Sequence, residues 1–547
     1  MASDESRVPA RAPASPAWIA ALDRVDALPG EQAGAQLVAL LADATVPEWL
    51  QCIQQLRLRR RWMLAEQVAR AALLRHPQPL DLRRALALIL LESGQLEPAT
   101  AALATIARGF PDDAATALAL ARALAQAGRN AAAADVILRL FAANAQPADV
   151  LIAAVELLDD CNRKSDAAQL CEDAIAAGCT DSRVRMQAGS LANQLGRFAD
   201  ARAHFMQVVA QDERAHEWFV ANGLAIAQRY ADATHPDFAL FKQALRRSDL
   251  SPRARASLWF ALGKGYDDLD EIEQAAMHFR QGNALRWQLR SWSREDWQRL
   301  VQSRLCAMAP APMPRSADWT PVFIVGIPRS GSSLIATRLA GHAGVRDRGE
   351  LPWLQHMARQ LPDLAHAPAS RLHELADIYQ SHLLQDDAPA RFYLDKQPLN
   401  LLFVDLILGL WPHARIVHCR RAARDTALSL WMQDFTDAQH GYAFDFDEIH
   451  AFMEGCERLM RHWQQRYADS IRRVEYSELV SAPEACIAEL ATWIGIDPAQ
   501  SAVHADPPGS IATASLWQAR QPVYTRSMGR WRAYAQAVPE LGMFPDA

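Results

Sequence analysis

Small residues recur every 34 positions through the first half of the chain. Each of five alanines is preceded, five residues earlier, by a turn position. The alanines are Ala65, Ala99, Ala133, Ala167 and Ala201, and the turn positions are Arg60, Gly94, Gly128, Asn162 and Gly196. Because alanine lets two helix backbones approach closely, one alanine per period predicts stacked helix pairs. A generic bundle would not keep one spacing over five units, so residues 35–300 are expected to form a repeat array.

A further unit carries a fuller repeat signature. Residues 259–279 read W-x2-L-G-x2-Y and then A-x3-F, which resembles the tetratricopeptide repeat. This unit is displaced by six residues from the 34-residue register, so an insertion is expected in residues 230–252. The resemblance implies an α-solenoid whose concave groove receives a peptide or partner protein, which the sequence does not identify.

A different pattern, strand, loop and helix, fills residues 321–342. The apolar run 322–325 leads into Gly326-x4-Gly331, and a helical pattern begins at Ser332. Such a loop turns backbone N–H groups inward, and the helix adds its positive dipole end, so the place suits a phosphate or sulfate group. The spacing matches a nucleoside-triphosphate P-loop, but serine stands where that motif requires lysine, which counts against a kinase or NTPase.

The loop resembles that of the sulfotransferases, which reads P-[RK]-S-G-[ST]-[ST]. Residues 328–333 read P-R-S-G-S-S. The resemblance implies that the loop holds the 5′ end of 3′-phosphoadenosine 5′-phosphosulfate, with 3′,5′-ADP as the product. The residues it assigns to that nucleotide are Arg329, Ser330, Gly331, Ser332 and Ser333.

Two further residues complete the expected catalytic set with Arg329. Glu350 follows a glycine, and a carboxylate beside an anion site suits a general base. Tyrosylprotein sulfotransferases and related bacterial enzymes have a similar Gly-Glu, which implies that role; a nearby histidine stays open as the alternative base. Lys396 follows the β-like run 391–394, at the strand end where open α/β sheets bind ligands. It resembles the lysine of the family's [DN]-K-x-P segment, which implies a position beside the bridging oxygen and the sulfonate.

Three arginines within five residues follow the predicted strand 415–419. They would repel one another unless an anion or a carboxylate neutralised them. The family's 3′-phosphate motif, R-D-x-R-x4-S, implies that Arg421 and Ser429 hold the nucleotide 3′-phosphate. It leaves Arg424 ion-paired for structure. Residues 422–423 are both alanine, a departure from the motif that affects the rigidity of the loop.

The tail of the chain, residues 515–532, has no regular period. It resembles the closing G-x-W segment of sulfotransferases, which implies that Tyr524 and Arg526 cover the nucleotide. The alternative is a surface amphipathic helix around Trp531.

Composition narrows the remaining classes. A chain of 547 residues exceeds one ordinary domain, and a net charge of −6 argues against bulk binding of nucleic acid. Eight cysteines without a C-x-x-C pair predict reduced core thiols in a cytoplasmic protein, and no metal site is expected. The first residues lack a basic region followed by an apolar core, and no apolar run reaches about 18 residues, so neither a signal peptide nor a membrane span is expected.

The patterns together predict an α-solenoid of tetratricopeptide repeats followed by an α/β, P-loop-like sulfotransferase domain with a parallel sheet. The expected parts are a disordered or capping segment over residues 1–34, the array over 35–300, a linker rich in Pro and Ala over 301–320 and the enzyme over 321–547.

The expected reaction is metal-free transfer of a sulfuryl group to an acceptor hydroxyl, with the array recruiting the substrate or a partner. The acceptor stays open among a peptide tyrosine, a saccharide and a small molecule. Tyrosylprotein sulfotransferases place an arginine where this chain has Pro352, which weakens the tyrosine reading. The alternatives are a non-catalytic nucleotide-binding adaptor built on repeats and a P-loop kinase or NTPase.

Overall fold

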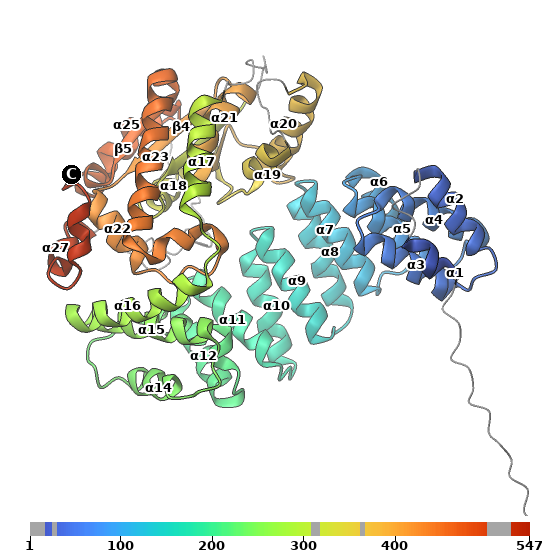
Figure 1. The fold of residues 1–547 in the computed structure, drawn as a ribbon, viewed down its shortest axis with the longest axis horizontal. Helices are drawn as coiled ribbons and strands as arrows, with labels where there is room; N and C mark the ends of the chain where they lie inside the picture. The colour runs from blue at the N-terminus through green and yellow to red at the C-terminus, as the bar shows by residue number, and fades with distance from the viewer. Residues whose placement is uncertain (1–16, 24–29, 308–317, 361–366, 500–526, 547) are drawn as a thin grey trace, which may run out of the picture. The chain divides into compact units, whose positions relative to one another are not determined.

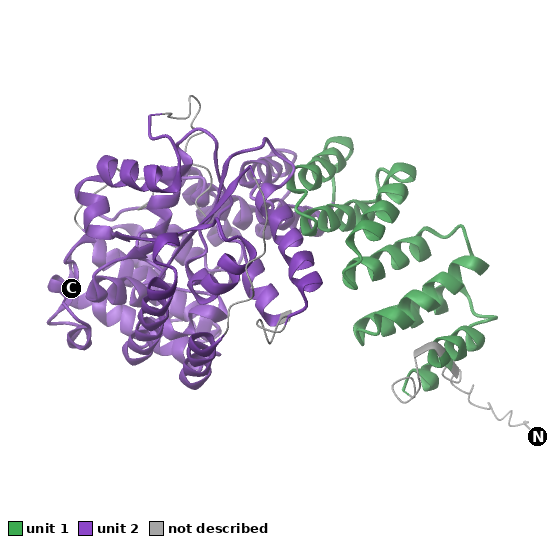
Figure 2. Cartoon of the chain, turned by 90° about the horizontal axis from the view of Figure 1, so that it is seen from above, with its two compact units in different colours: residues 1–146 green, residues 147–547 purple. Residues whose placement is uncertain are grey.

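The computed structural model describes residues 17–23, 30–307, 318–360, 367–499 and 527–546. The chain forms two compact units, residues 1–146 and 147–547, which Figure 2 shows in different colours. The first unit contains helices alone over its described residues. The second holds further helix pairs and the only sheet of the described chain.

The first unit is built from successive helices, of which α2 to α8 are joined by short turns (Figure 1). The helices are α1 (Ala17–Leu22), α2 (Gly30–Leu40), α3 (Val46–Leu58), α4 (Trp62–Arg75), α5 (Leu80–Glu92), α6 (Leu96–Gly109), α7 (Ala114–Gln126) and α8 (Asn130–Ala143). The residues of the 34-residue series behave as expected. Its alanines in this unit are fully buried, and Arg60, Gly94 and Gly128 all have positive φ, which the tight turn within each helix pair requires.

The second unit continues the pattern before the insertion and after it. Its first helices are α9 (Ala148–Asp160), α10 (Lys164–Ala176), α11 (Ser182–Gln194), α12 (Phe198–Gln211), η2 (Ala215–Trp218), α13 (Val220–Ile226), α14 (Pro236–Leu245), α15 (Pro252–Asp268), α16 (Ile272–Leu289) and α17 (Arg294–Cys306). The expected insertion contains α14. In the last pair, a Cβ on Gly263 would lie 2.7 Å from the ring of Phe279, so glycine is what lets α15 and α16 pack closely. The repeat array is confirmed.

The sheet has five parallel strands in the order β2-β3-β1-β4-β5. The strands are β1 (Thr320–Gly326), β2 (Val345–Asp347), β3 (Phe392–Asp395), β4 (Arg415–Arg420) and β5 (Ile471–Glu475). Residues 321–326 of β1 are all buried, as an apolar run in a sheet covered on both faces should be. The predicted parallel sheet is therefore confirmed.

Helices connect the strands and cover the sheet. They are α18 (Ser332–Ala340), α19 (Trp353–Gln360), α20 (Ala369–Leu384), η3 (Pro398–Phe403), α21 (Val404–Leu410), α22 (Ala423–Trp431), η4 (Ala438–Phe444), α23 (Phe446–Arg466), η5 (Ala468–Ser470), α24 (Tyr476–Ser481), α25 (Pro483–Ile494), α27 (Trp531–Tyr534) and η7 (Pro539–Met543). The connection leaving β1 runs toward β2, and the one leaving β4 runs the other way, toward β5. A switch point, where such sheets bind ligands, thus lies between β1 and β4.

The end of the repeat array packs into the same core as the sheet domain. On α17, Arg304 forms a buried ion pair with Asp405 of α21, and its Nε donates to the Leu402 carbonyl at 2.9 Å. On α16, Arg286 Nε donates to Asp434 at 2.7 Å, in a second buried pair. These contacts make α16 and α17 structural parts of the sheet domain.

The expected linker over residues 301–320 therefore begins inside a packed helix. Residues 301–306 belong to α17, because its buried face is held by the sheet domain, and residues 308–317 lie outside the described residues. The segment 1–34 contains α1 and the start of α2, and its residues 1–16 and 24–29 also lie outside. The other domain boundaries stay predictions.

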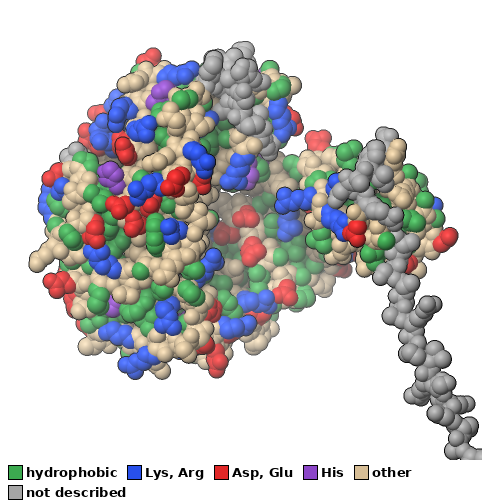
Figure 3. Space-filling model, viewed as in Figure 1, with side chains coloured by type: hydrophobic (Ala, Val, Ile, Leu, Met, Phe, Trp, Pro, Cys, Tyr) green, Lys and Arg blue, Asp and Glu red, His purple; other side chains and the backbone are tan. Residues whose placement is uncertain are grey.

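Three features of the described residues concern charge, membrane-spanning helices and metal-binding groups. Figure 3 shows Lys and Arg interspersed with Asp and Glu on the visible face of the sheet domain. Among the described residues, no helix combines the length and apolarity needed to cross a bilayer. The same residues contain no group of three or more His, Cys, Asp or Glu placed to hold a metal ion.

Replacing Arg304 tests whether α17 is part of the sheet domain. Arg304→Leu leaves Asp405 buried without its cation, so it should destabilise the second unit by about 3–5 kcal/mol, measured by urea unfolding of the full chain. The control is Arg299→Leu on the same helix, whose exposed pair with Asp296 should matter little. Equal unfolding midpoints for the two variants would mean that α17 is not held by this contact.

Candidate active site

The loop after β1 is shaped by two glycines and one strained arginine. A Cβ on Gly326 would lie 2.4 Å from the Cys419 carbonyl, so the backbone of β4 excludes any side chain there. Gly331 has a φ of 101°, and a Cβ on it would lie 2.7 Å from the Tyr476 ring. Arg329 has a φ of 73°, which costs a non-glycine residue free energy and recurs at functional sites. The loop is therefore held in one specific conformation.

The loop and the start of α18 form a cradle of hydrogen-bond donors. Ser330 is 3% exposed, and its buried Oγ has no hydrogen-bond partner among the described residues. Ser332 is also buried and begins α18, whose first backbone N–H groups have no carbonyl partner within the helix. The helix dipole adds partial positive charge at this end. An unpaired buried hydroxyl beside such amides fits an anionic ligand.

Residues predicted to bind opposite ends of the nucleotide meet behind this loop. Arg329 Nε donates to Ser429 Oγ on α22 at 3.0 Å, and Arg421 Nη1 donates to the Arg329 carbonyl at 3.2 Å. The guanidinium of Arg421 lies 5.0 Å from the centroid of the Tyr476 ring. Sequence reasoning missed Tyr476, although its place directly after β5, at the carboxyl end of a parallel strand, was a usable signal.

Glu350 and Lys396 are in contact at the ends of β2 and β3, on the side of β1 away from β4. The turn after β2 is fastened to the end of β3, because Lys396 N donates to the Gly349 carbonyl at 2.8 Å. The Nζ of Lys396 then donates to Glu350 Oε1. Lys396 is 4% exposed, whereas the Glu350 side chain is 39% exposed. The carboxylate is therefore open to an incoming molecule, and the cation lies beneath it.

A buried network supports this pair from below. Asp395 is fully buried and accepts hydrogen bonds from Tyr379 Oη, from Asn400 Nδ2 at 2.8 Å and from Leu351 N at 3.4 Å. Burial raises the pKa of Asp395 to about 7. Leu351 directly follows Glu350, and Lys396 directly follows Asp395. The hydrogen bonds of Asp395 therefore fix the backbone on both sides of the Glu350–Lys396 contact. Tyr379 and Asn400 gave no sequence signal.

The histidine alternative for the base has weaker geometric support. His356 on α19 is exposed, and its Nδ1 lies 2.9 Å from the Pro352 carbonyl. The ring of His382 stacks on Trp353 with centroids 3.9 Å apart. Glu350, in contrast, is in direct contact with Lys396, which makes it the better placed candidate.

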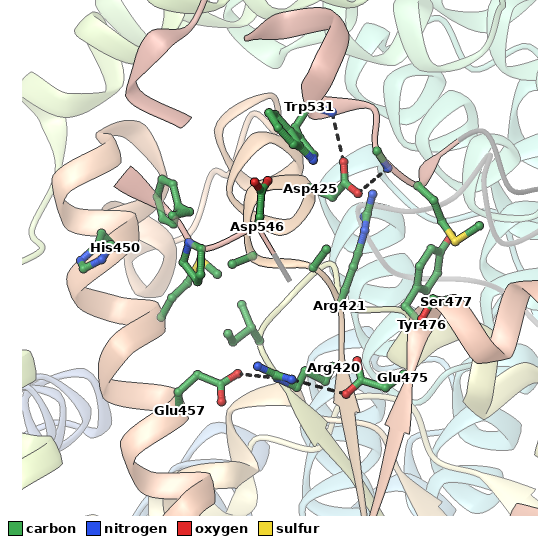
Figure 4. Close-up of a pocket in the computed structure, with 18 of the residues that line it drawn as sticks. Arg420, Arg421, Asp425, His450, Glu457, Glu475, Tyr476, Ser477, Trp531 and Asp546 are labelled. Atoms are coloured by element: carbon green, nitrogen blue, oxygen red, sulfur yellow. Dashed lines mark hydrogen bonds and ion pairs between the residues drawn. The ribbon is translucent and has the colours of Figure 1, made fainter. Parts of the chain in front are cut away.

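The closing segment, defined here as residues 527–546, lies against the start of α22. Asp425 accepts from the backbone N–H groups of Gly529 and Trp531 at 2.7 and 3.1 Å (Figure 4), and Arg421 Nη2 donates to the Ser527 carbonyl at 2.7 Å. Sequence reasoning gave Asp425 no role. Tyr524 and Arg526 lie outside the described residues.

Arg424 is paired, as predicted. Its Nε donates to the Phe544 carbonyl at 2.9 Å, it forms an ion pair with Asp546, and its guanidinium lies 4.4 Å from the Trp531 ring centroid. The side chain thus binds the closing segment and is engaged by protein groups.

A cavity of about 740 Å³ opens between the ends of β4 and β5, α23 and the closing segment (Figure 4). Arg421 and Tyr476 line it, together with Arg420, which lies between Glu457 at 3.3 Å and Glu475 at 3.5 Å. The size is typical of small-molecule sites. The charge of Arg420 is therefore neutralised by two carboxylates, whereas the contacts of Arg421 are to two backbone carbonyls and to the Tyr476 ring.

The buried Asp395 makes a pH prediction. Between about pH 4 and pH 7 the Asp395 carboxyl keeps its proton in the folded chain and has lost it in the unfolded chain. The free energy of unfolding therefore falls as pH rises through this window, by up to about 1.4 kcal/mol per pH unit. Asp395→Asn carries no such proton. The urea midpoint of Asp395→Asn minus that of wild type should therefore increase with pH across this window and become constant above it. Asp377→Asn, an exposed site on α20, is the control. A constant difference for Asp395→Asn would contradict the assignment.

Comparison with known proteins places the second half of the chain. Residues 321–500 match the model of the Sulfotransferase family. An uncharacterized protein of Aquifex aeolicus is 26% identical over 330 residues, which cover 55% of this chain and 43% of that protein. Protein-tyrosine sulfotransferase 1 of Danio rerio is 25% identical over 237 residues, covering 39% of this chain and 66% of its own. This chain thus spans less than two thirds of either relative.

Among solved structures, the sulfotransferase domain from the Synechococcus PCC 7002 olefin synthase matches with a TM-score of 0.30 and 18% identity, covering 43% of this chain and 97% of that domain. The family match covers the parallel sheet and the loop after β1 described above. In this chain an array of helix pairs with a 34-residue repeat is followed by a parallel-sheet domain, and residues 321–500 of that domain are similar to the Sulfotransferase family.

Proposed function

We propose that this protein transfers a sulfuryl group from 3′-phosphoadenosine 5′-phosphosulfate to an acceptor hydroxyl. The observation that carries the proposal is the meeting of three motifs at neighbouring strand ends. The Ser330 cradle follows β1, the Glu350–Lys396 pair joins the ends of β2 and β3, and Arg421 follows β4. An anion cradle and a carboxylate therefore share one edge of the sheet.

The donor nucleotide fits the residues present. The 5′ phosphosulfate would be held by the loop amides together with Arg329, Ser330, Ser332 and Ser333. Ser330 Oγ is buried without a hydrogen-bond partner among the described residues, so it can donate to an oxygen of that group. Arg421 and Ser429 would hold the 3′-phosphate, and the cavity beside Tyr476 is large enough for the adenosine. Gly331, Tyr524 and Arg526 stay predicted contacts.

The chemistry needs a proton acceptor and charge stabilisation. The bound donor supplies an activated sulfuryl group; the sulfur–oxygen bond to its phosphate breaks as one to the acceptor oxygen forms, and 3′,5′-ADP leaves. Glu350 takes the acceptor's proton, a role typically worth about 10²–10⁴-fold in rate. Lys396 holds the carboxylate in place, and its buried positive charge would stabilise the negative charge that develops on the leaving oxygen.

We infer the class of the acceptor from one relative and from one residue of this chain. One relative is named for a protein tyrosine, so a tyrosyl hydroxyl is the first class to try. Pro352 occupies the position at which those enzymes carry an arginine, so saccharide and small-molecule hydroxyls belong in the same screen. The repeat array would recruit the acceptor or a partner protein.

Replacing Glu350 tests the base. Glu350→Gln removes the proton acceptor but keeps the shape, so kcat should fall by about 10²–10⁴-fold with the affinity for 3′,5′-ADP unchanged. Turnover is read by product mass from labelled donor with tyrosyl, saccharide and small-molecule acceptor pools. The control is Glu374→Gln, an exposed carboxylate on α20. A Glu350→Gln enzyme that retains most of its kcat would eliminate Glu350 as the base.

Replacing Arg421 tests the 3′-phosphate site. Wild type should bind 3′,5′-ADP more tightly than 5′-AMP, and Arg421→Ala should reduce that preference by about tenfold or more, because a charged hydrogen bond is lost. Calorimetric titration gives both affinities. Arg420→Ala is the matched control on the neighbouring residue, since its charge is already neutralised by Glu457 and Glu475. An unchanged preference in Arg421→Ala would remove Arg421 from the site.

A further inference from the structure

The closing segment contacts the last repeat as well as the sheet domain. Asp267, in the final turn of α15, accepts hydrogen bonds from Arg530 Nη2 and from Tyr534 Oη. Its side chain is 11% exposed, and Tyr534 is fully buried. Burying a carboxylate is costly unless donors satisfy it, and the closing segment supplies two of them. The last repeat thus has a specific binding place for this segment.

A second contact anchors the segment farther along. Arg280 on α16 donates to both carboxylate oxygens of Glu540, at 2.6 and 2.9 Å, and to the Ala537 carbonyl at 3.0 Å. Both helices of the last repeat pair therefore hold the closing segment.

In the closing segment, the residue that binds Asp267 is next in sequence to residues that contact α22 and the candidates for the nucleotide site. The side chain of Arg530 reaches Asp267, and the backbone N–H groups on either side of it, at Gly529 and Trp531, donate to Asp425 on α22. Three residues before Arg530, the Ser527 carbonyl accepts from Arg421, and Ser527 Oγ lies 2.7 Å from the Tyr476 hydroxyl. A four-residue stretch connects the repeat to the arginine.

We propose that Asp267 of the last repeat is a positioning residue for the donor-nucleotide site. It holds the closing segment against α22, and the segment in turn contacts Arg421, which also donates to the Arg329 carbonyl of the loop. The identity of the ligand rests on the proposed function; the mechanical connection does not. The last repeat pair is then part of the enzyme's binding site as well as a recruiting surface.

The rival explanation is that Asp267 only joins the repeat to the sheet domain. Glu448 provides the comparison, since it accepts from Arg294 and from Trp292 Nε1 on the repeat side and has no contact with the closing segment among the described residues. Both carboxylates receive one arginine and one aromatic donor. Glu448→Ala is therefore a matched control for Asp267→Ala.

The test uses the full-length chain and two readouts. Hydrogen exchange of the backbone amides of Gly529 and Trp531, measured without nucleotide, reports whether the segment is docked. Calorimetric titration with 3′,5′-ADP reports affinity, and steady-state kinetics report KM for the donor and kcat. In Asp267→Ala, exchange should quicken and both Kd and KM should rise about tenfold, because undocking reduces the competent fraction, with kcat at saturating donor retained.

Two variants guard against misfolding. Tyr534→Phe removes one donor and keeps the buried ring, so it should move the same readouts in the same direction by less. Asp267→Asn keeps an oxygen acceptor and should restore part of the affinity. Glu448→Ala should leave exchange and Kd as in wild type, whatever its effect on Tm.

The outcomes separate the two claims. Faster exchange with an unchanged Kd for 3′,5′-ADP, or equal Kd changes in Asp267→Ala and Glu448→Ala, would overturn the positioning role. A wild-type chain that does not bind 3′,5′-ADP would instead overturn the proposed function. Unaltered exchange in Asp267→Ala would refute the anchor itself.

Discussion

Parallel pairing of β1 with β3 and β4 is the constraint on which the candidate site depends. In this register Phe323 lies beside Asp395 and Gly326 beside Cys419, so the residues that follow each strand emerge at one edge of the sheet. Lys396 and Arg421 are then neighbours of the loop, although they lie roughly 70 to 90 residues beyond it in sequence. Side chains so distant in the chain converge only because the strands run in the same direction.

Close backbone approach makes this arrangement sensitive to small changes. The Cys419 carbonyl occupies the space a side chain on Gly326 would need, and the Tyr476 ring does the same at Gly331. The two glycines therefore let the loop pack closely against the end of β4 and against Tyr476, the residue after β5. The left-handed Arg329 within it carries strain that its neighbours must hold, which the contacts with Ser429 and Arg421 do.

The sequence predicted local features well and long-range ones poorly. The 34-residue spacing, the glycine-bounded loop and the apolar strands are written in consecutive residues, so they were readable. The three-residue β2 is too short to show alternation. The apolar pattern of residues 398–410 likewise does not show that this segment begins as the 3₁₀ helix η3 and continues as α21.

Contacts across the fold left no such signal. The pair Asp267–Arg530 and the capping of the closing segment by Asp425 depend on packing alone. The expected linker overlaps α17 at residues 301–306 for a related reason. The proline- and alanine-rich composition marks where the helix pattern stops, but it does not show that Arg304 is already buried against Asp405. Position in the fold, and not composition, decides where one domain ends.

A calorimetric titration of the full chain with 3′,5′-ADP and with ATP and Mg²⁺ tests the central claim most directly. A cradle of amides and serines with arginines behind it, and no lysine after the second glycine, should bind 3′,5′-ADP in preference, with an affinity that Mg²⁺ does not change. Tighter, Mg²⁺-dependent binding of ATP would contradict the account and make the domain a nucleoside-triphosphate site.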